Sequence, residues 1–317
     1  MSDQTRMYWI HALTPLHVGA GRGVGYIDLP IMREKVTKLP LVPGSAIKGV
    51  LADHYGASDK ESRYADEIKR KAFGISDPDK RDSSESGANS GSLVFTDARL
   101  VCLPVRSLYG TFAWCTSPLV LTRLLRDLEA AKLSNQLTAP GWIEPQHVHV
   151  AKDANSVLRG NDSKVYLEDL DLSFRECPVA AAWAEFLGTW LFGTSDKEKP
   201  WREAFRQRFA VVPDDIFNFL CETGTEVVAR VKIDDEKKTV VGGALWYEES
   251  LPAETILAGL VWCDRVFGQK SNGNGAITEA NLLDTFCSKE LPLQIGGKAT
   301  VGKGRVRCAF TKTEGGQ

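Results

Sequence analysis

One carboxylate, Asp28, lies on a segment bordered by glycine and proline that has few apolar neighbours able to bury it. An aspartate in such a place can hold Mg²⁺ or accept a proton, and either role would serve the cutting of RNA by its own 2′-OH. His17 and Arg33 lie close by in the sequence and could assist, and we predict that both bind RNA. A structural alternative stays open for all three, since Asp28 could cap a turn before Leu29.

A phosphate-binding position is predicted shortly after Asp28. The run Pro43-Gly44-Ser45 opens a helix, with Ser45 as its N-cap and apolar residues recurring at helical spacing through position 55. Free backbone N–H groups at this start, with Lys48 in the first turn, would suit a phosphate. A carboxylate near a phosphate seat favours chemistry on a nucleotide backbone.

A glycine-rich loop near the C-terminus matches the pattern G-x-x-x-x-G-K over residues 297–303. A nucleoside-triphosphatase loop needs Ser or Thr next, followed by a helix, but the next residue is Gly304 and a basic strand is predicted after it. Glycine amides and lysine still suit an anion, so we predict a loop that grips RNA backbone. Its RNA-binding residues are Gly296, Gly297, Lys298, Thr300, Lys303 and Arg305.

Two weaker patterns point to other ligands. Four glycines alternate from Gly19 to Gly25, but they do not form the dinucleotide fingerprint. His147 and His149 alternate on a predicted strand, yet no third ligand stands at a usable spacing for zinc. The role of residues 137–175 stays unassigned.

The composition is that of a soluble globular protein of 317 residues, with 43% hydrophobic and 25% charged residues. A net charge of −2 argues against binding nucleic acid through bulk charge and leaves local basic clusters around 33–48 and 298–312, which could also be solvated faces. Seven scattered cysteines, a polar N-terminus and the lack of a long apolar run predict a cytoplasmic protein without a membrane partner.

Helices and strands are interspersed, which predicts an α+β fold with helices on one face of a sheet. Strands are expected at 7–14, 93–103, 293–295 and 305–310, and helices at 59–73, from 118, at 178–192, through 220 and after Thr278. Residues 226–233 and 239–247 predict a long hairpin whose charged turn, 234–238, is too polar to be buried.

Several of these stretches resemble, in family order, the RAMP proteins of type III CRISPR effector complexes. The similarity is specifically to the Cas7-like backbone subunit of the type III-B (Cmr) complex. The matching residues are 27–31, 33–34, 43–49, 95–100, 104–107, 243–249 and 295–304.

The resemblance implies a single RAMP domain over residues 1–317. Its ferredoxin-like (RRM-like) palm would comprise about 1–55, 93–135 and 250–312. Insertions would occupy about 56–92 and, as a helical insertion, about 136–225. The hairpin, about 226–248, would be a projecting thumb that displaces a base from the guide–target duplex.

The resemblance also implies a function. The chain would bind CRISPR guide RNA, polymerise with copies of itself into a filament, and join other Cmr complex subunits. It would be an endoribonuclease that cuts complementary target RNA at regular intervals, with Asp28 as the catalytic aspartate and a possible ligand of Mg²⁺ or another divalent cation. Its glycine-rich C-terminal loop would lie against the guide RNA.

Two alternatives remain at this point. The chain could be a guide-binding scaffold that does not cut RNA, or a nucleotide-using metabolic enzyme. A test for metal-dependent cleavage of target RNA distinguishes the scaffold from an endoribonuclease. The glycine at position 304 argues against the metabolic enzyme.

Overall fold

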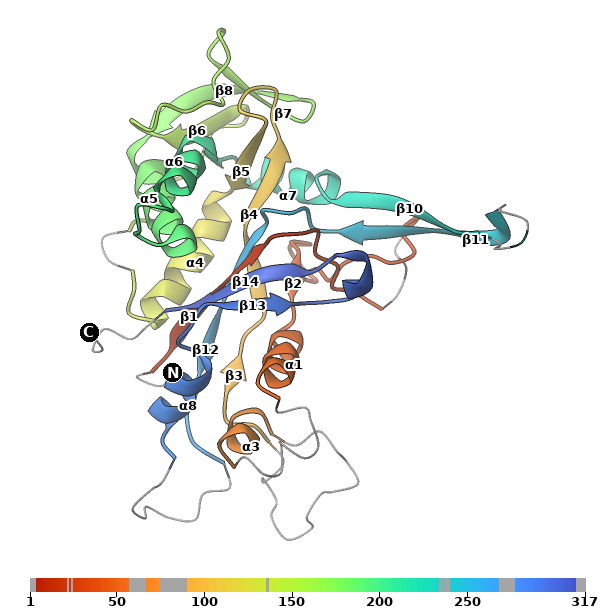
Figure 1. Cartoon of the computed structure of the whole chain (residues 1–317). Coiled ribbons are helices and arrows are strands. Elements are labelled where there is room, and N and C mark those ends of the chain that lie inside the picture. The colour runs from red at the N-terminus through yellow and green to blue at the C-terminus, as the bar shows by residue number, and fades with distance from the viewer. Residues whose placement is uncertain are drawn as a thin grey trace.

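The computed structural model describes residues 4–21, 23, 25–56, 67–74, 90–134, 137–233, 236, 240–267 and 277–311. The fold is a mixed α+β architecture built on a 12-stranded sheet, with a separate two-stranded hairpin (Figure 1). Among the described residues there are seven α-helices. None of these helices has the length and apolar character needed to cross a membrane.

The central strand is β1 (Arg6–Ala12), which is buried along its whole length. It pairs antiparallel with β12 (Ile256–Trp262) on one side and β14 (Arg305–Phe310) on the other. Beyond β12 lies β4 (Ala98–Arg106), so the order at the centre is β14-β1-β12-β4. The short strands β2 (Leu41–Val42), β3 (Val94–Phe95) and β13 (Leu291–Gln294) flank these four.

Both faces of the sheet are covered, because alternate side chains of β1 enter different cores. Tyr8 and Ile10 pack in a core with helices α1, α3, α7 and α8, whereas Met7 and Trp9 pack in a second core with α4, α5 and α6. The prediction of helices on one face is therefore wrong. The unbroken apolar run of β1 is typical of a strand buried on both sides.

The segment predicted as a helical insertion, 136–225, contains strands as well as helices, and its strands extend the main sheet. Together with β5 (Phe112–Thr116), which precedes the segment, its strands continue the order β4-β5-β9-β6-β8-β7. The strands within the segment are β6 (His147–Ala151), β7 (Lys164–Leu167), β8 (Leu170–Cys177) and β9 (Phe209–Val211). The helices of the segment are α5 (Pro178–Phe192), α6 (Lys199–Arg208) and α7 (Asp214–Thr223).

The start signals of two other helices are confirmed. Ser117 caps α4 (Pro118–Ala130), and Thr278 forms a capping box with Asn281 at the start of α8 (Glu279–Phe286). Ser45, by contrast, is not an N-cap: α1 (Gly44–His54) begins at Gly44, and its N-cap is Pro43, which makes no side-chain cap. Of the helix expected at 59–73, residues 59–66 lie outside the described part, and the rest forms α3 (Glu67–Phe73).

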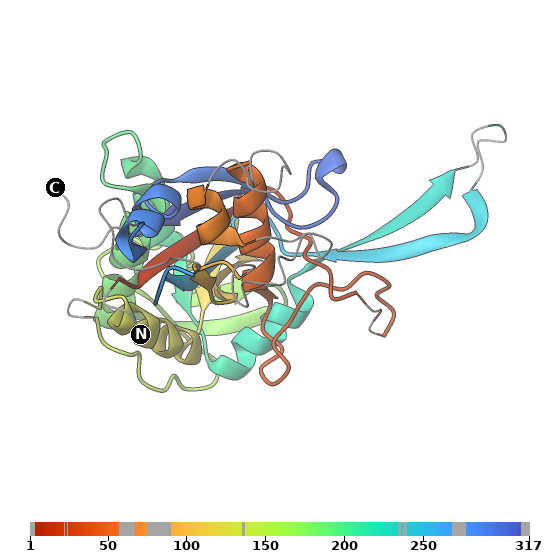
Figure 2. The same ribbon diagram turned by 90° about the horizontal axis from the view of Figure 1, so that it is seen from below.

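The predicted hairpin is formed by β10 (Glu226–Ile233) and β11 (Val240–Ser250). It projects far from the rest of the molecule (Figure 2). Cross-strand partners share a face, and on one face the partners are apolar and exposed: Val231 opposite Leu245, and Ala229 opposite Tyr247. Except for residue 236, the predicted charged turn at 234–238 lies outside the described residues.

A substitution at Gly44 tests why helix α1 begins at this residue. A Cβ at this position would lie 2.4 Å from the Phe95 carbonyl oxygen and 2.6 Å from that of Thr96. Gly44→Ala must therefore push α1 away from the β3–β4 turn, and we expect a loss of about 1–3 kcal/mol in the free energy of unfolding. Denaturant unfolding measures this loss.

Gly49 on the same helix provides the matched control, because a Cβ there meets nothing within 4 Å. Gly49→Ala should stabilise the protein by roughly 0.5–1 kcal/mol through helix propensity alone. Equal effects of the two substitutions would contradict the steric explanation.

Candidate functional site

Asp28 lies at the root of the hairpin, with its side chain exposed. Its Oδ2 accepts a hydrogen bond from the Tyr247 backbone N–H at 2.8 Å, and the Leu29 N–H donates to the Tyr247 carbonyl at 3.0 Å. The segment around Asp28 thus pairs with β11. Within the described residues, the structure gives Oδ1 of Asp28 no partner, so this oxygen is available to a ligand.

Two tyrosines stand beside this carboxylate. The rings of Tyr26 and Tyr247 meet edge to face with centroids 6.3 Å apart, and Tyr26 is 73% exposed. Exposed aromatic rings at the root of a projecting strand pair offer a stacking surface to a nucleobase.

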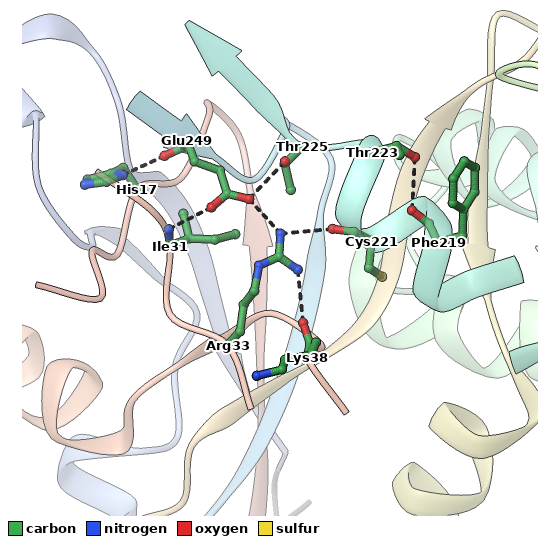
Figure 3. A network of polar contacts seen from close by, with 9 residues as sticks. All are labelled: His17, Ile31, Arg33, Lys38, Phe219, Cys221, Thr223, Thr225 and Glu249. Atoms are coloured by element: carbon green, nitrogen blue, oxygen red, sulfur yellow. Dashed lines mark hydrogen bonds and ion pairs between the residues drawn. The ribbon is translucent and has the colours of Figure 1, made fainter. Parts of the chain in front are cut away.

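Arg33 is held within the protein (Figure 3). Its Nη2 lies 2.6 Å from Oε1 of Glu249 and donates to the Cys221 carbonyl at 3.0 Å, while Nη1 donates to the Lys38 carbonyl at 3.0 Å. Arg33 thus fastens the segment after Asp28 to β11 and to the end of α7.

His17 is buried between the hairpin and the final loop. Its Nδ1 lies 2.6 Å from the Glu249 carbonyl oxygen, so this nitrogen carries a proton and donates. Its own carbonyl accepts from the Gly297 N–H at 2.9 Å. His17 therefore links the glycine-rich loop to the hairpin root, beside Asp28's segment.

The lysine of the G-x-x-x-x-G-K pattern points inward. Lys303 has a side chain only 8% exposed, and its Nζ lies 2.7 Å from Oε1 of Glu248 and 2.7 Å from the Ser250 hydroxyl oxygen. Burial would raise the pKa of Glu248, but the hydrogen bond and charge of Lys303, with Lys298 nearby, outweigh it and lower that pKa. The charge of Lys303 is thus already paired with that of Glu248. We therefore expect Lys303 to aid RNA binding by holding the loop in place.

The same loop explains why glycine stands where a nucleoside-triphosphatase would have Ser or Thr. Gly304 has φ = 78°, and a Cβ there would lie 2.1 Å from the Ile295 carbonyl oxygen. Strand β14 follows the loop. Of the RNA-binding residues predicted in and beside this loop, Gly296, Gly297, Thr300 and Arg305 are exposed and Lys298 is partly exposed.

Helix α1 carries two residues that were predicted to bind phosphate, Ser45 and Lys48. Ser45 is exposed, whereas Nζ of Lys48 donates to the Leu93 carbonyl at 2.7 Å, and burial lowers the pKa of Lys48. The first amide of the helix, Gly44 N–H, donates to Oδ1 of Asp97 at 2.8 Å. A carboxylate of the same chain thus takes part of the predicted phosphate seat.

The histidine pair on β6 has no metal-binding surroundings. His147 Nδ1 lies 3.1 Å from Oε2 of Glu144. Burial, followed by the charge of Arg175, lowers the pKa of His149. No group of three or more His, Cys, Asp or Glu side chains able to hold a metal occurs within the described part of the chain.

Glu248 and Glu249 are site residues that sequence reasoning missed. Their side chains are 1% and 3% exposed, and they anchor the final loop and the Asp28 segment respectively. The sequence pattern carried a signal for this role. Consecutive residues of a strand point to opposite faces, so two adjacent glutamates cannot both face solvent where the end of the strand is enclosed.

The chain matches the model of the RAMP superfamily over residues 9–307. It is 36% identical to the CRISPR system Cmr endoribonuclease Cmr4 of Pyrococcus furiosus, covering 95% of this chain and 94% of that protein. It is 26% identical to the CRISPR system CMR subunit Cmr4 of Saccharolobus solfataricus, covering 96% and 95%.

The structural likeness agrees with the sequence match. The crystal structure of oligomeric Cmr4 from Pyrococcus furiosus superposes with a TM-score of 0.67 at 28% identity, covering 98% of this chain and all of that one. The family resemblance inferred from the sequence motifs is confirmed: the chain belongs to the RAMP superfamily and, within it, to the family of the Cmr4 proteins.

Proposed function

We propose that this chain is the guide-RNA-binding backbone subunit of a type III-B CRISPR effector complex and cuts complementary target RNA at regular intervals. The observation that carries the proposal is Asp28, an exposed carboxylate fixed on β11 at the root of a projecting hairpin. The similarity to a protein named a Cmr endoribonuclease supports the same activity.

In this proposal the hairpin is a thumb on a ferredoxin-like palm. The order β14-β1-β12-β4 supports the palm: numbered along the chain, these four strands run 4-1-3-2, with α1 after the first strand and α8 before the last. The projection of the hairpin and its exposed apolar face support a thumb that wedges between bases.

The partners follow from the same role. Guide RNA, complementary target RNA, other Cmr subunits and further copies of this chain would assemble together. The related Pyrococcus protein has been crystallised as an oligomer, which supports self-association. The exposed and partly exposed residues in and beside the loop, Lys298 and Arg305 among them, would contact phosphates of the guide.

For cleavage, Asp28 would take the proton of the target's 2′-OH, whose oxygen then attacks the adjacent phosphorus. The bond from phosphorus to the 5′-oxygen of the next nucleotide would break, water would protonate that leaving oxygen, and a 2′,3′-cyclic phosphate would remain. Because Oδ2 is held by Tyr247 N–H, Oδ1 would act. One free carboxylate oxygen also fits Mg²⁺, which keeps several waters and needs few protein ligands. When bound, the ion would offset charge on the phosphate.

Asp28→Asn should separate cutting from binding. The amide oxygen can still accept from Tyr247 N–H, so the segment stays in place, but proton transfer and metal binding are lost. We expect the cleavage rate in the assembled complex to fall roughly 10²–10⁴-fold, with guide and target affinity nearly unchanged. Single-turnover cleavage and filter binding measure the two quantities.

Asp53→Asn, an exposed aspartate on α1, is the matched control and should cut normally. A 2′-deoxy nucleotide at the cut position should block cleavage, and EDTA should stop it until Mg²⁺ is restored. If the Asp28→Asn complex cuts at the wild-type rate, the assignment of Asp28 as the catalytic residue is wrong.

The apolar face of the hairpin should set where the target is cut. Val231→Thr with Leu245→Thr replaces a facing pair by residues that keep the strands but are polar. We expect normal folding and guide binding, and irregular cut positions on a sequencing gel. Val36→Thr, at a residue 90% exposed elsewhere, should leave the ladder regular. A regular ladder from the double variant would rule out a thumb role for this face.

Salt dependence should distinguish exposed from buried cations of the final loop. Lys298→Ala with Arg305→Ala should weaken guide binding and reduce the slope of log K against log salt concentration by about 1–2 units. Lys303→Met should instead destabilise the fold, because it leaves Glu248 buried without its close partner. The assignment is wrong if Lys303→Met alone flattens the slope while the melting temperature stays unchanged.

A further inference from the structure

The Glu249 carboxylate is enclosed at the hairpin root, and its side chain is 3% exposed. Its Oε2 accepts from the Ile31 backbone N–H at 3.0 Å, and its Oε1 accepts from Arg33 at 2.6 Å and from the Thr225 hydroxyl at 3.0 Å (Figure 3). Ile31 and Arg33 belong to the segment that carries Asp28, and Thr225 directly precedes β10.

The main chain of Glu249 adds two more contacts. Its N–H donates to the Leu29 carbonyl at 3.0 Å, and its own carbonyl accepts from His17 Nδ1 at 2.6 Å. One residue therefore holds positions 29, 31 and 33 of the segment that follows Asp28. The Asp28 carboxylate makes its own hydrogen bond two residues earlier on the same strand, at Tyr247.

A buried carboxylate makes such a junction stiff. Moving the segment would withdraw the Ile31 N–H or the Arg33 guanidinium from a charge that has no water to replace them. Arg33 is tied in turn to the carbonyls of Lys38 and Cys221. The ion pair of Glu249 with Arg33 therefore adds to the two hydrogen bonds with Tyr247 that hold the Asp28 segment on the hairpin.

We propose that Glu249 and Arg33 are positioning residues for RNA cleavage, forming a clamp that holds Asp28 at the hairpin root. The clamp rests on the proposed function of Asp28, but it acts only through the main chain of residues 29–31. Arg33, predicted from the sequence to bind RNA, thereby has its charge directed to Glu249. Since small misplacements of a reacting group are costly, a loosened clamp should slow cleavage without weakening binding.

Glu249→Gln tests the clamp with little change of shape. The amide oxygen can still accept from Ile31 N–H, but the charge facing Arg33 is lost. In the assembled complex at saturating target, we expect the single-turnover cleavage rate to fall about 10- to 100-fold. Guide and target dissociation constants should stay within about twofold, because the Glu249 side chain is buried and its change to an amide alters no exposed charge.

Asp127→Asn is the matched control. Its carboxylate is also largely buried and paired with an arginine, Arg99, but the pair joins α4 to β4. The same change of carboxylate to amide should lower the melting temperature and leave the cleavage rate within about twofold. An equal loss of cleavage in both variants would overturn the clamp, because general destabilisation would then explain it.

Amide hydrogen exchange provides a readout independent of activity. In Glu249→Gln, the amides of Leu29 and Ile31 should exchange about tenfold faster, while those of β1 keep their rate. If Glu249→Gln does not fold, Arg33→Lys serves instead, because it keeps the charge but loses the guanidinium hydrogen bonds to the carbonyls of Cys221 and Lys38. We expect the same slower cleavage and the same faster exchange of the two amides in that variant.

The outcomes separate the clamp from the proposed function. If the wild-type complex cuts and Glu249→Gln cuts equally fast, the clamp fails alone. If the wild-type complex does not cut, the proposed function fails, and exchange decides whether the clamp exists. Unchanged exchange at Leu29 and Ile31 overturns it in either case.

Discussion

Two buried carboxylates on consecutive residues, Glu248 and Glu249, stand where the hairpin joins the main sheet. Successive side chains of a strand point to opposite faces, so each charge needs its own cation from a different part of the chain. Lys303 meets one and Arg33 meets the other. The requirement that neither charge be left unpaired fixes the glycine-rich loop, the Asp28 segment and the hairpin relative to one another.

Features that depend on neighbours in the sequence could be predicted well. Ser117 and Thr278 begin helices because their hydroxyls reach amides within one turn, and the two hairpin strands follow from their composition and the polar stretch between them. Asp28 stood out because its segment offers little to bury it, and the structure leaves it exposed.

Features that depend on distant partners could not be predicted in this way. The pattern around Lys303 predicted an anion-binding lysine, and in the structure its ammonium group pairs with the Glu248 carboxylate of the same chain. Lys303 also donates to the hydroxyl of Ser250, which lies 53 residues away in the sequence. Lys48 likewise met the Leu93 carbonyl, 45 residues on. Strands β6, β7 and β9 have only three to five residues and gain their identity by joining the sheet, so the local signal for strands within residues 136–225 was too weak.

The place of β1 also bears on how the chain is made. Its neighbours, β12 and β14, are translated long after it, and the Met7 N–H donates to a hydroxyl 304 residues later, on Thr311. While the ribosome is still at work, the first strand emerges with two unpaired edges and two apolar faces. The main sheet closes only after β14 has left the exit tunnel, and until then the growing chain exposes apolar surface that can aggregate.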